Sequence, residues 1–143
     1  MGMIIRPFEK SDYKQWLPLW NANGHNQVTQ DVTNQTWQRL CDPNAPVNGY
    51  GAFIDGQLAG IMHYILHPIT GDLNPACYMQ DLYTAEDMRR KGIARALVER
   101  LGLEGKDQGW ARIYWLAEAN NEPVQNLYKT LGIKLNFTFH VLP

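Results

Sequence analysis

Hydrophobic side chains recur along this chain with two different periods, and these periods predict its strands and helices. Alternation or a short apolar run is typical of a strand, whereas apolar residues three or four positions apart are typical of a helix. Ile93, Leu97 and Leu101 recur every four residues and predict an amphipathic helix. Asp55 and Gly56 lie between two apolar runs and predict the type I′ turn of a hairpin. Together the patterns predict strands at residues 4–8, 50–54, 57–66, 76–84, 112–117 and 135–142, and helices at residues 12–20, 34–41, 89–109 and 121–131.

The order of these elements, β-α-α-β-β-β-α-β-α-β, predicts an α+β fold. No internal repeat or linker divides the chain, so we expect a single domain over residues 1–143. The last run alternates cleanly, with Leu135, Phe137 and Phe139 on one face, and predicts a closing strand. The outer edge of that strand would be free to pair with another subunit, so we expect a homodimer.

Composition and charge narrow the class of protein. The chain has 143 residues, of which 45% are hydrophobic and 19% are charged, as in a globular domain. Thirteen basic and fourteen acidic residues give a net charge of -1, which excludes a global basic field for nucleic acid or an anionic membrane. Cys41 and Cys77 form neither a disulfide framework nor a zinc motif, so we expect no metal. We find no secretory signal and no apolar run of membrane-spanning length, and therefore expect a cytoplasmic protein.

A strand followed by a glycine-containing helix start is the sharpest local motif. The strand at 76–84 leads through a short acidic link to the helix predicted at 89–109, whose first turn contains Gly92. The first N–H groups of a helix lack partners and lie at the positive end of its dipole, so they bind anions such as phosphate. Gly92 has no Cβ to hold a phosphate away. Residues 86–100 contain five basic side chains against three acidic ones, namely Arg89, Arg90, Lys91, Arg95 and Arg100 against Glu86, Asp87 and Glu99.

The sequence resembles the GNAT superfamily of acyl-CoA-dependent N-acyltransferases through two motifs in the family's order. Residues 89–94 match Gln/Arg-x-x-Gly-x-Gly/Ala at the helix start, and residues 121–132 match Asn-x-x-Ala-x-x-Leu-Tyr-x-x-x-Gly, with Val124 in place of alanine. The resemblance implies a central mixed, largely antiparallel and splayed sheet flanked by helices on both faces. It also implies an acetyl-CoA-dependent N-acetyltransferase. The chain is similar to the histone- and polyamine-acetylating branch at Trp16-Leu17-Pro18-Leu19-Trp20, His67-Pro68, Gln80-Asp81-Leu82 and Tyr114-Trp115-Leu116.

The resemblance assigns roles in binding acetyl-CoA, the expected co-substrate. Backbone groups of the strand end would pair with the amide-rich pantetheine arm, which requires that strand to have parted from its neighbour. N–H groups of residues 90–95 would hold the pyrophosphate, with charge-assisted bonds from basic side chains. The implied cofactor-binding residues are Leu82, Tyr83, Thr84, Arg89, Arg90, Lys91, Gly92, Ile93, Ala94, Arg95, Asn121 and Tyr128.

The resemblance implies that Tyr128 is the general acid, because a phenol with a pKa near ~10 can protonate the departing CoA thiolate. The general base stays open. Many relatives have a glutamate where this chain has Gln80, and an amide cannot act as a base. Asp81 is adjacent, but strict alternation directs its side chain to the opposite face of the strand from Gln80. Glu118 lies near the end of the next strand, so the candidates are Asp81, then Glu118, then water alone. Neither cysteine lies in a motif that would activate it, so we expect direct attack of the amine on the thioester.

The acceptor is expected to be a primary amine of a small molecule, such as a polyamine or an amino acid. The candidate acceptor-binding residues are Trp20, His25, Gln80 and Trp115, and we interpret the remaining histidines, His63, His67 and His140, as surface residues. Three alternatives remain: a protein lysine or N-terminal acetyltransferase, a CoA-binding module with little catalysis, and a plain nucleotide-phosphate binder.

Overall fold

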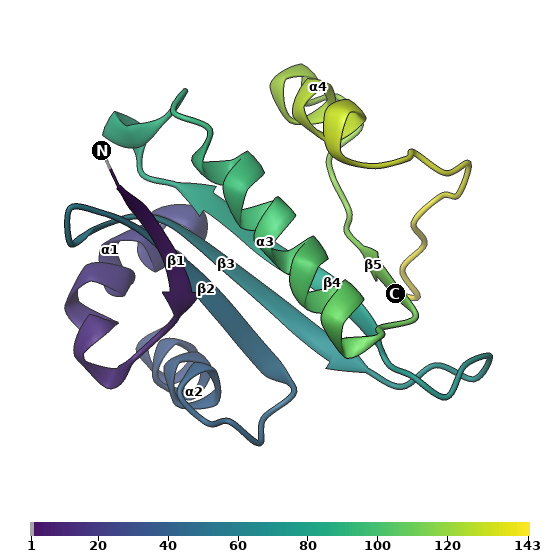
Figure 1. Cartoon of the computed structure of the whole chain (residues 1–143), viewed down its shortest axis with the longest axis horizontal. Helices are drawn as coiled ribbons and strands as arrows, with labels where there is room; N and C mark the ends of the chain where they lie inside the picture. The colour runs from purple at the N-terminus through teal and green to yellow at the C-terminus, as the bar shows by residue number, and fades with distance from the viewer. Residues whose placement is uncertain (1) are drawn as a thin grey trace.

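Strands and helices follow one another as β-α-α-β-β-β-α-β-α in the computed structural model of the protein, which describes residues 2–143 (Figure 1). This order agrees with the predicted one up to the last helix. The strands are β1 (Met3–Pro7), β2 (Val47–Ile54), β3 (Gln57–His67), β4 (Ala76–Thr84) and β5 (Arg112–Tyr114). The helices are α1 (Tyr13–Asn23), α2 (Gln30–Leu40), α3 (Ile93–Gln108) and α4 (Glu122–Leu131), and short 3-10 turns at Lys10–Asp12 and Glu86–Met88 precede α1 and α3.

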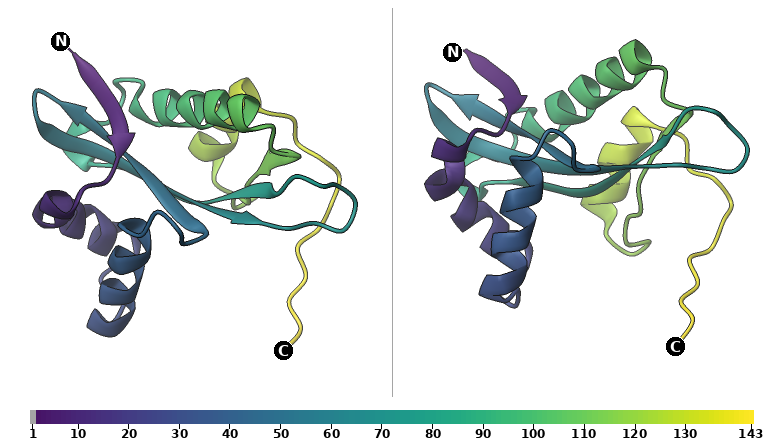
Figure 2. Two further views of the ribbon diagram at one scale, coloured as in Figure 1. Left: turned by 60° about the horizontal axis from the view of Figure 1, so that its bottom comes forward. Right: turned by 90° about the horizontal axis from the view of Figure 1, so that it is seen from below.

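The five strands form one mixed sheet in the order β1-β2-β3-β4-β5. The first four pair antiparallel, and β5 joins β4 in parallel. Helices α1 and α2 lie on one face of the sheet, α3 covers the other face, and α4 packs beside α3 (Figures 1 and 2). This architecture confirms the predicted α+β fold, in which a mixed sheet lies between helices.

Local turn and capping residues determine where several elements begin and end. Asp55 and Gly56 have φ angles of 51° and 81°, as the type I′ turn of the β2–β3 hairpin requires. The side chain of Thr29 accepts a hydrogen bond from the N–H of Val32 and caps α2. This cap starts α2 four residues earlier than the apolar pattern predicts. Gly109, with a φ of 72°, ends α3.

The hydrophobic core has two parts, one on each face of the sheet. The larger part lies under α3, where Ile93, Leu97 and Leu101 are almost fully buried against β2, β3 and β4. Gly60 permits the close approach of α3, because a Cβ there would lie 2.7 Å from Cγ2 of Ile93. The smaller part lies under α1 and α2 and contains the fully buried Trp16. Both helix layers are therefore fixed to the sheet by packing.

Strands β4 and β5 form a fork. They pair only at Ala76–Arg112, Cys77–Ile113 and Tyr78–Tyr114. Beyond Tyr78, β4 continues to Thr84 with β3 on one side and without a strand on the other. The predicted splay of the sheet is therefore present, and it leaves the backbone groups on one edge of residues 79–84 without ladder partners.

A β-bulge interrupts the pairing of β3 with β4. Tyr64 pairs with Met79 and His63 pairs with Asp81, so Gln80 is the extra residue of β4. The sequence-based expectation that Gln80 and Asp81 point to opposite faces is therefore wrong, because a bulge breaks the two-residue alternation. Both side chains line the same cavity on the face covered by α1 and α2.

The predicted closing strand at residues 135–142 is absent from the structure. The chain beyond α4 is an extended tail that leaves the body of the molecule (Figure 2). Its alternating apolar residues are solvent-exposed, with 64% of Leu135 and 84% of Phe137 accessible. An apolar face becomes a strand only where a neighbouring edge accepts its ladder hydrogen bonds, and β5, the last strand of the sheet, has three residues.

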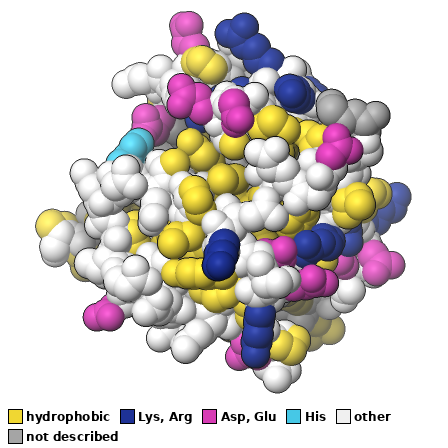
Figure 3. Space-filling model, turned by 90° about the vertical axis from the view of Figure 1, so that its left-hand side faces the viewer, with side chains coloured by type: hydrophobic (Ala, Val, Ile, Leu, Met, Phe, Trp, Pro, Cys, Tyr) yellow, Lys and Arg dark blue, Asp and Glu magenta, His cyan; other side chains and the backbone are white. Residues whose placement is uncertain are grey.

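The molecular surface has no region of a single charge sign on the face seen in Figure 3. Acidic and basic side chains alternate around a group of hydrophobic ones on this face, as the near-zero net charge suggests. Within residues 2–143, no helix is both long enough and apolar enough to cross a bilayer.

Candidate active site

The start of α3 is a cradle of backbone N–H groups formed by two residues in the left-handed region. Arg90 has a φ of 66° and Gly92 a φ of 76°, and Gly92 is the N-cap of the helix. No side chain at the N-cap accepts from the first N–H groups of α3. The position that a Cβ of residue 92 would occupy has no atom within 4 Å. The geometry is that of an open anion-binding helix start.

Basic side chains connect this cradle to its neighbours. Nε of Arg89 donates to the carbonyl oxygen of Thr84 at 3.2 Å, and the guanidinium lies 5.5 Å from the centroid of the Tyr83 ring. This contact ties the helix start to the free end of β4. Arg95 donates to the hydroxyl of Thr130 on α4. Among the other predicted cofactor-binding residues here, the exposed ones are Arg90, Lys91 and Gly92, whereas Ala94 is half-buried and Ile93 is buried in the core.

The strand end that leads to the cradle is the free edge of β4. Leu82, Tyr83 and Thr84 pair with β3 and are half-buried, and their opposite backbone edge faces no strand. An extended ligand with amide groups can add to such an edge as a strand does. The structure therefore brings together the strand residues that the resemblance implies and the helix start that the sequence pattern selected.

Tyr128 and Asn121 lie on the far side of the fork, in α4 and at its N-cap. The Asn121 side chain accepts a hydrogen bond from the N–H of Val124 at 3.3 Å and so caps the helix. The ring of Tyr128 packs 5.1 Å from that of Trp115, centroid to centroid. Burial raises the pKa of Tyr128 above its usual value near 10, so the phenol keeps its proton throughout the neutral range and is available as an acid.

Asp81 is held by two donors at the bulge. One carboxylate oxygen lies 3.0 Å from Nδ1 of His63, and the other accepts from the side-chain amide of Asn23 at 3.2 Å. A carboxylate has about four lone-pair sites, so two stay available. The side chain is 22% exposed. Asp81 is thus fixed in orientation and still accessible.

His63 has a defined tautomer because both ring nitrogens are engaged. Nε1 of Trp16 donates to Nε2 of His63 at 3.0 Å, so Nε2 is an acceptor and the ring proton is on Nδ1. Nδ1–H then donates to Asp81. His63 is only 2% exposed, so its interpretation as a surface residue is wrong. The alternation in β3 allowed a buried histidine, but only the cross-strand partner reveals its role.

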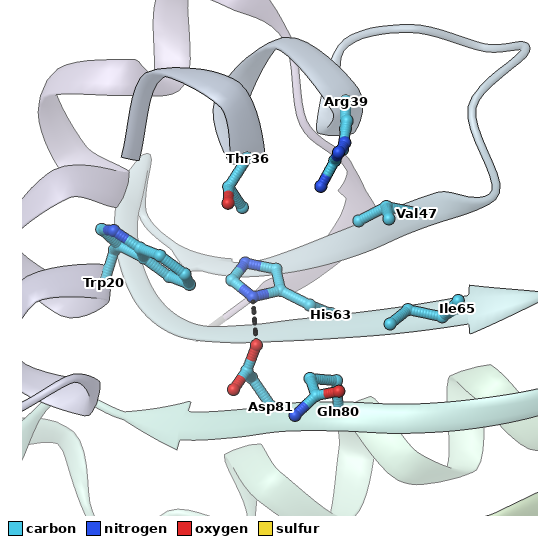
Figure 4. A pocket seen from close by; sticks show the side chains of 8 residues that line it. All are labelled: Trp20, Thr36, Arg39, Val47, His63, Ile65, Gln80 and Asp81. Atoms are coloured by element: carbon cyan, nitrogen blue, oxygen red, sulfur yellow. Dashed lines mark hydrogen bonds and ion pairs between the residues drawn. The ribbon is translucent and has the colours of Figure 1, made fainter. Parts of the chain in front are cut away.

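A cavity of about 280 Å³ opens beside Asp81, between the sheet and helices α1 and α2 (Figure 4). Trp20 and Gln80, both predicted to contact the acceptor, line it. The other two predicted acceptor-binding residues do not line this cavity. His25 follows α1 and has a φ of 54°, and Trp115 packs on Tyr128. The lining residues are Trp20, Thr36, Arg39, Val47, His63, Ile65, Gln80 and Asp81.

Comparison with known proteins decides the family. The family model described as "Acetyltransferase (GNAT) family" matches residues 9–133, most of the chain. The chain belongs to the GNAT family. The D-amino-acid N-acetyltransferase HPA3 of Saccharomyces cerevisiae is 29% identical over 137 residues, covering 92% of this chain and 85% of that protein. The thialysine N-epsilon-acetyltransferase of Caenorhabditis elegans is 32% identical over 88 residues, covering 62% of this chain and 54% of that protein.

A solved structure shares the fold of this chain. The structure of AAC(6')-Iy in complex with a bisubstrate analogue, CoA-S-monomethyl-acetylneamine, superposes with a TM-score of 0.87 at 16% identity. The superposition covers 100% of this chain and 98% of that one. The two chains therefore share the fold along almost their whole length.

In this GNAT protein the two carboxylate candidates for the base have different surroundings. Asp81 lines the cavity and is oriented by His63. Glu118 lies in the exposed loop between β5 and α4, where its backbone carbonyl accepts from the side chain of Gln125. Glu118 does not line the cavity beside Asp81.

Arg39 is the charged cavity residue that sequence reasoning missed. It lies in the last turn of α2, on a helix whose face toward the sheet is apolar at Leu40. The sequence gives only a weak indication of a binding role for Arg39, because an arginine near the C-terminal end of a helix is ordinarily explained by its interaction with the helix dipole. Only the folding of α2 over β2 and β3 brings this guanidinium to the side of the cavity that faces Asp81 (Figure 4).

The thiols of this GNAT protein are poor nucleophiles. Burial raises the pKa of Cys77 to about 12, and it also raises the pKa of Cys41. Neither thiol is therefore ionised near neutral pH. In the part of the chain that the structure describes, no group of three or more His, Cys, Asp or Glu side chains is arranged to hold a metal ion.

Proposed function

We propose that this protein is an acetyl-CoA-dependent N-acetyltransferase that transfers the acetyl group to a primary amine of a small molecule. One observation carries the proposal: the free edge of β4 leads from the open helix start of α3 to Asp81 at the bulge. The names of the relatives agree, since they describe acetyltransferases of D-amino acids and thialysine, and the fold neighbour was solved with a CoA-containing analogue.

Acetyl-CoA would bind along the fork. The N–H groups of residues 90–95 would hold the pyrophosphate, assisted by the exposed guanidinium and ammonium groups around Gly92. The free backbone edge of Leu82, Tyr83 and Thr84 would pair with the pantetheine amides. Asn121 and Tyr128 would contact the cofactor from the α4 side.

Catalysis would follow direct attack. Asp81 accepts a proton from the acceptor ammonium, and the freed nitrogen attacks the carbonyl carbon of the thioester. As the C–S bond breaks, Tyr128 gives its phenolic proton to the sulfur, and the products are the N-acetylated amine and CoA. The second nitrogen proton restores the phenol, and Asp81 releases its proton to solvent. Direct attack agrees with the un-ionised thiols of Cys41 and Cys77.

The acceptor would enter the cavity beside Asp81. A volume of about 280 Å³ lies at the lower end for ligand sites, which favours a small amine. Trp20 and Gln80 line this cavity and would contact the acceptor, whereas His25 and Trp115 would act from outside it.

We also propose that the protein is a homodimer. The apolar side chains of residues 133–143 are exposed in the single chain, and pairing with a second subunit would bury them. The cytoplasmic location and the single domain over residues 1–143 stay predictions from the sequence.

Release of CoA with a panel of amines tests the proposed function. The panel contains amino acids, polyamines, an aminoglycoside and a lysine-containing peptide, each with acetyl-CoA in excess. Turnover of a small amine supports the proposal. Turnover of the peptide alone identifies a protein acetyltransferase instead, and CoA binding without turnover of any amine identifies a binding module.

A further inference from the structure

The cavity beside Asp81 contains two opposite formal charges on opposite walls. Asp81 enters from β4, and Arg39 enters from α2, with His63 between them (Figure 4). An acceptor amine needs the carboxylate, but it gains nothing from a guanidinium. The role of Arg39 in a site for amines therefore requires its own explanation.

Arg39 is not used by the fold. Within residues 2–143 its guanidinium forms no ion pair and no hydrogen bond with another side chain, although it can donate five. In contrast, Arg6 is paired with Asp12, and Arg100 with Glu104. The donors of Arg39 are thus available to a ligand.

The chemistry of these walls selects among amines. A guanidinium presents a planar fork that matches a carboxylate with two parallel hydrogen bonds. A polyamine would instead bring a second ammonium toward Arg39, and like charges in a small cavity repel. Thr36 lies one helical turn before Arg39 and also lines the cavity, so its hydroxyl is positioned to donate to the same anion.

We infer that the acceptor of this enzyme is a free amino acid, whose carboxylate binds Arg39 and whose ammonium binds Asp81. The inference rests on the proposed function, since it names the substrate class of the same site. Asp81 keeps two lone-pair sites for the ammonium after accepting from His63 and Asn23. A zwitterion therefore meets a group of complementary charge for its ammonium and another for its carboxylate in one cavity.

The apolar part of the lining indicates which side chain the amino acid carries. Val47 and Ile65, from β2 and β3, present apolar groups to the cavity, and Trp20 adds an aromatic face. A volume of about 280 Å³ has room for an aliphatic side chain. Leucine, in both enantiomers, is the appropriate probe.

Three acceptors with the same side chain test the inference: leucine, leucinamide and 3-methylbutylamine. Leucine keeps the carboxylate, leucinamide replaces it with a neutral amide, and 3-methylbutylamine lacks it. We expect kcat/KM for at least one enantiomer of leucine to exceed the values for leucinamide and 3-methylbutylamine by about 10- to 100-fold. This factor is the expected effect of losing the charge-assisted hydrogen bonds between the carboxylate and Arg39. The three amines differ in basicity and therefore in intrinsic reactivity. For each variant we therefore take the ratio of kcat/KM for leucine to kcat/KM for each of the other two amines. Intrinsic reactivity cancels when this ratio is compared between variants.

The variant Arg39→Met removes the guanidinium and keeps an unbranched side chain on the exposed surface of α2. We expect it to lower kcat/KM for leucine by about 10- to 100-fold, chiefly through KM, and to leave 3-methylbutylamine within about twofold. Arg39→Lys retains the charge without the fork, so it should restore part of the preference. Arg112→Met, at the β5 edge of the sheet, is the matched control and should leave the ratio unchanged.

The possible results separate this inference from the proposed function. Turnover of 3-methylbutylamine as efficient as that of leucine in the wild type overturns the inference and leaves the acetyltransferase in place. A wild-type preference for leucine that survives in Arg39→Met also overturns it. Turnover of no amine at all overturns the proposed function, and the inference with it.

Discussion

Replacing Asp81 with asparagine tests the assignment of the general base. Asp81→Asn keeps the shape of the side chain and removes its ability to take a proton. The Nδ1–H of His63 can still donate to the new amide oxygen, but the amide nitrogen cannot accept from Asn23. The lost hydrogen bond costs about 1 kcal/mol, which is small beside the expected catalytic loss.

The size of that loss follows from the protonation state of the acceptor. For 3-methylbutylamine, an alkylammonium with a pKa near ~10.4, about one molecule in 10³ is neutral at pH 7.4. Without a base in the cavity, only this fraction attacks the thioester, so we expect kcat/KM to fall by up to about 10³-fold. The rate of the variant should then rise about tenfold per pH unit from pH 7 to 9, because the neutral fraction of the amine rises by that factor.

The assay follows the release of the CoA thiol at saturating acetyl-CoA over this pH range, and Glu118→Gln is measured in parallel. We expect Glu118→Gln to stay within about twofold of the wild type, because Glu118 does not line the cavity. A large loss in Glu118→Gln with none in Asp81→Asn would refute the assignment and make Glu118 the base. Unchanged activity in both variants would leave water as the proton acceptor.

Three further predictions concern the acid, the fold and the tail. Tyr128→Phe should lower kcat by about 10²-fold or more with little change in the affinity for acetyl-CoA measured by calorimetry, and an unchanged kcat would remove Tyr128 from the acid role. Asp12, 4% exposed, accepts two hydrogen bonds from Arg6, which lowers its pKa below the usual value near 3.8. Its stabilisation is therefore full above that usual value and is lost as the pH falls through the lowered pKa. Asp12→Ala should reduce the free energy of unfolding, measured in urea, by about 2 kcal/mol at pH 7, a moderate value because Arg6 is partly solvated. The reduction should be much smaller at pH 2, where the carboxylate is protonated. An equal loss at both pH values would contradict the role of the charge. Deleting residues 133–143 should convert a dimer to a monomer in light scattering, and a monomeric mass for the full chain would argue against the homodimer.

Elements with a local signal could be predicted from the sequence. The β2–β3 hairpin follows from Asp55 and Gly56, which adopt the left-handed backbone that its turn requires. The limits of β4 coincide with the apolar run at 76–84. The four-residue spacing of Ile93, Leu97 and Leu101 gave the buried face of α3. In each case a few neighbouring residues determine the backbone conformation.

Features that depend on distant partners could not be predicted in this way. The bulge at Gln80 is a mismatch between two strands, so neither strand contains its signal alone. The hydrogen bonds of His63 connect α1, β3 and β4, which are remote in sequence. The tail has the period of a strand, but a strand also needs an edge to pair with. Arg39 reaches the cavity only because α2 folds over the sheet.

The two ends of the fork between β4 and β5 differ, so the fork also distinguishes the two ends of the proposed cofactor site. The strands meet at Tyr78, next to the bulge and Asp81, and they are farthest from pairing at Thr84, which Arg89 ties to the start of α3. If acetyl-CoA binds along the free edge as we propose, its thioester would lie at the apex and its phosphates at the mouth, beside the start of α3. The register of β4 and β5 therefore fixes where the fork opens, and a shift of that register would move its apex away from Asp81.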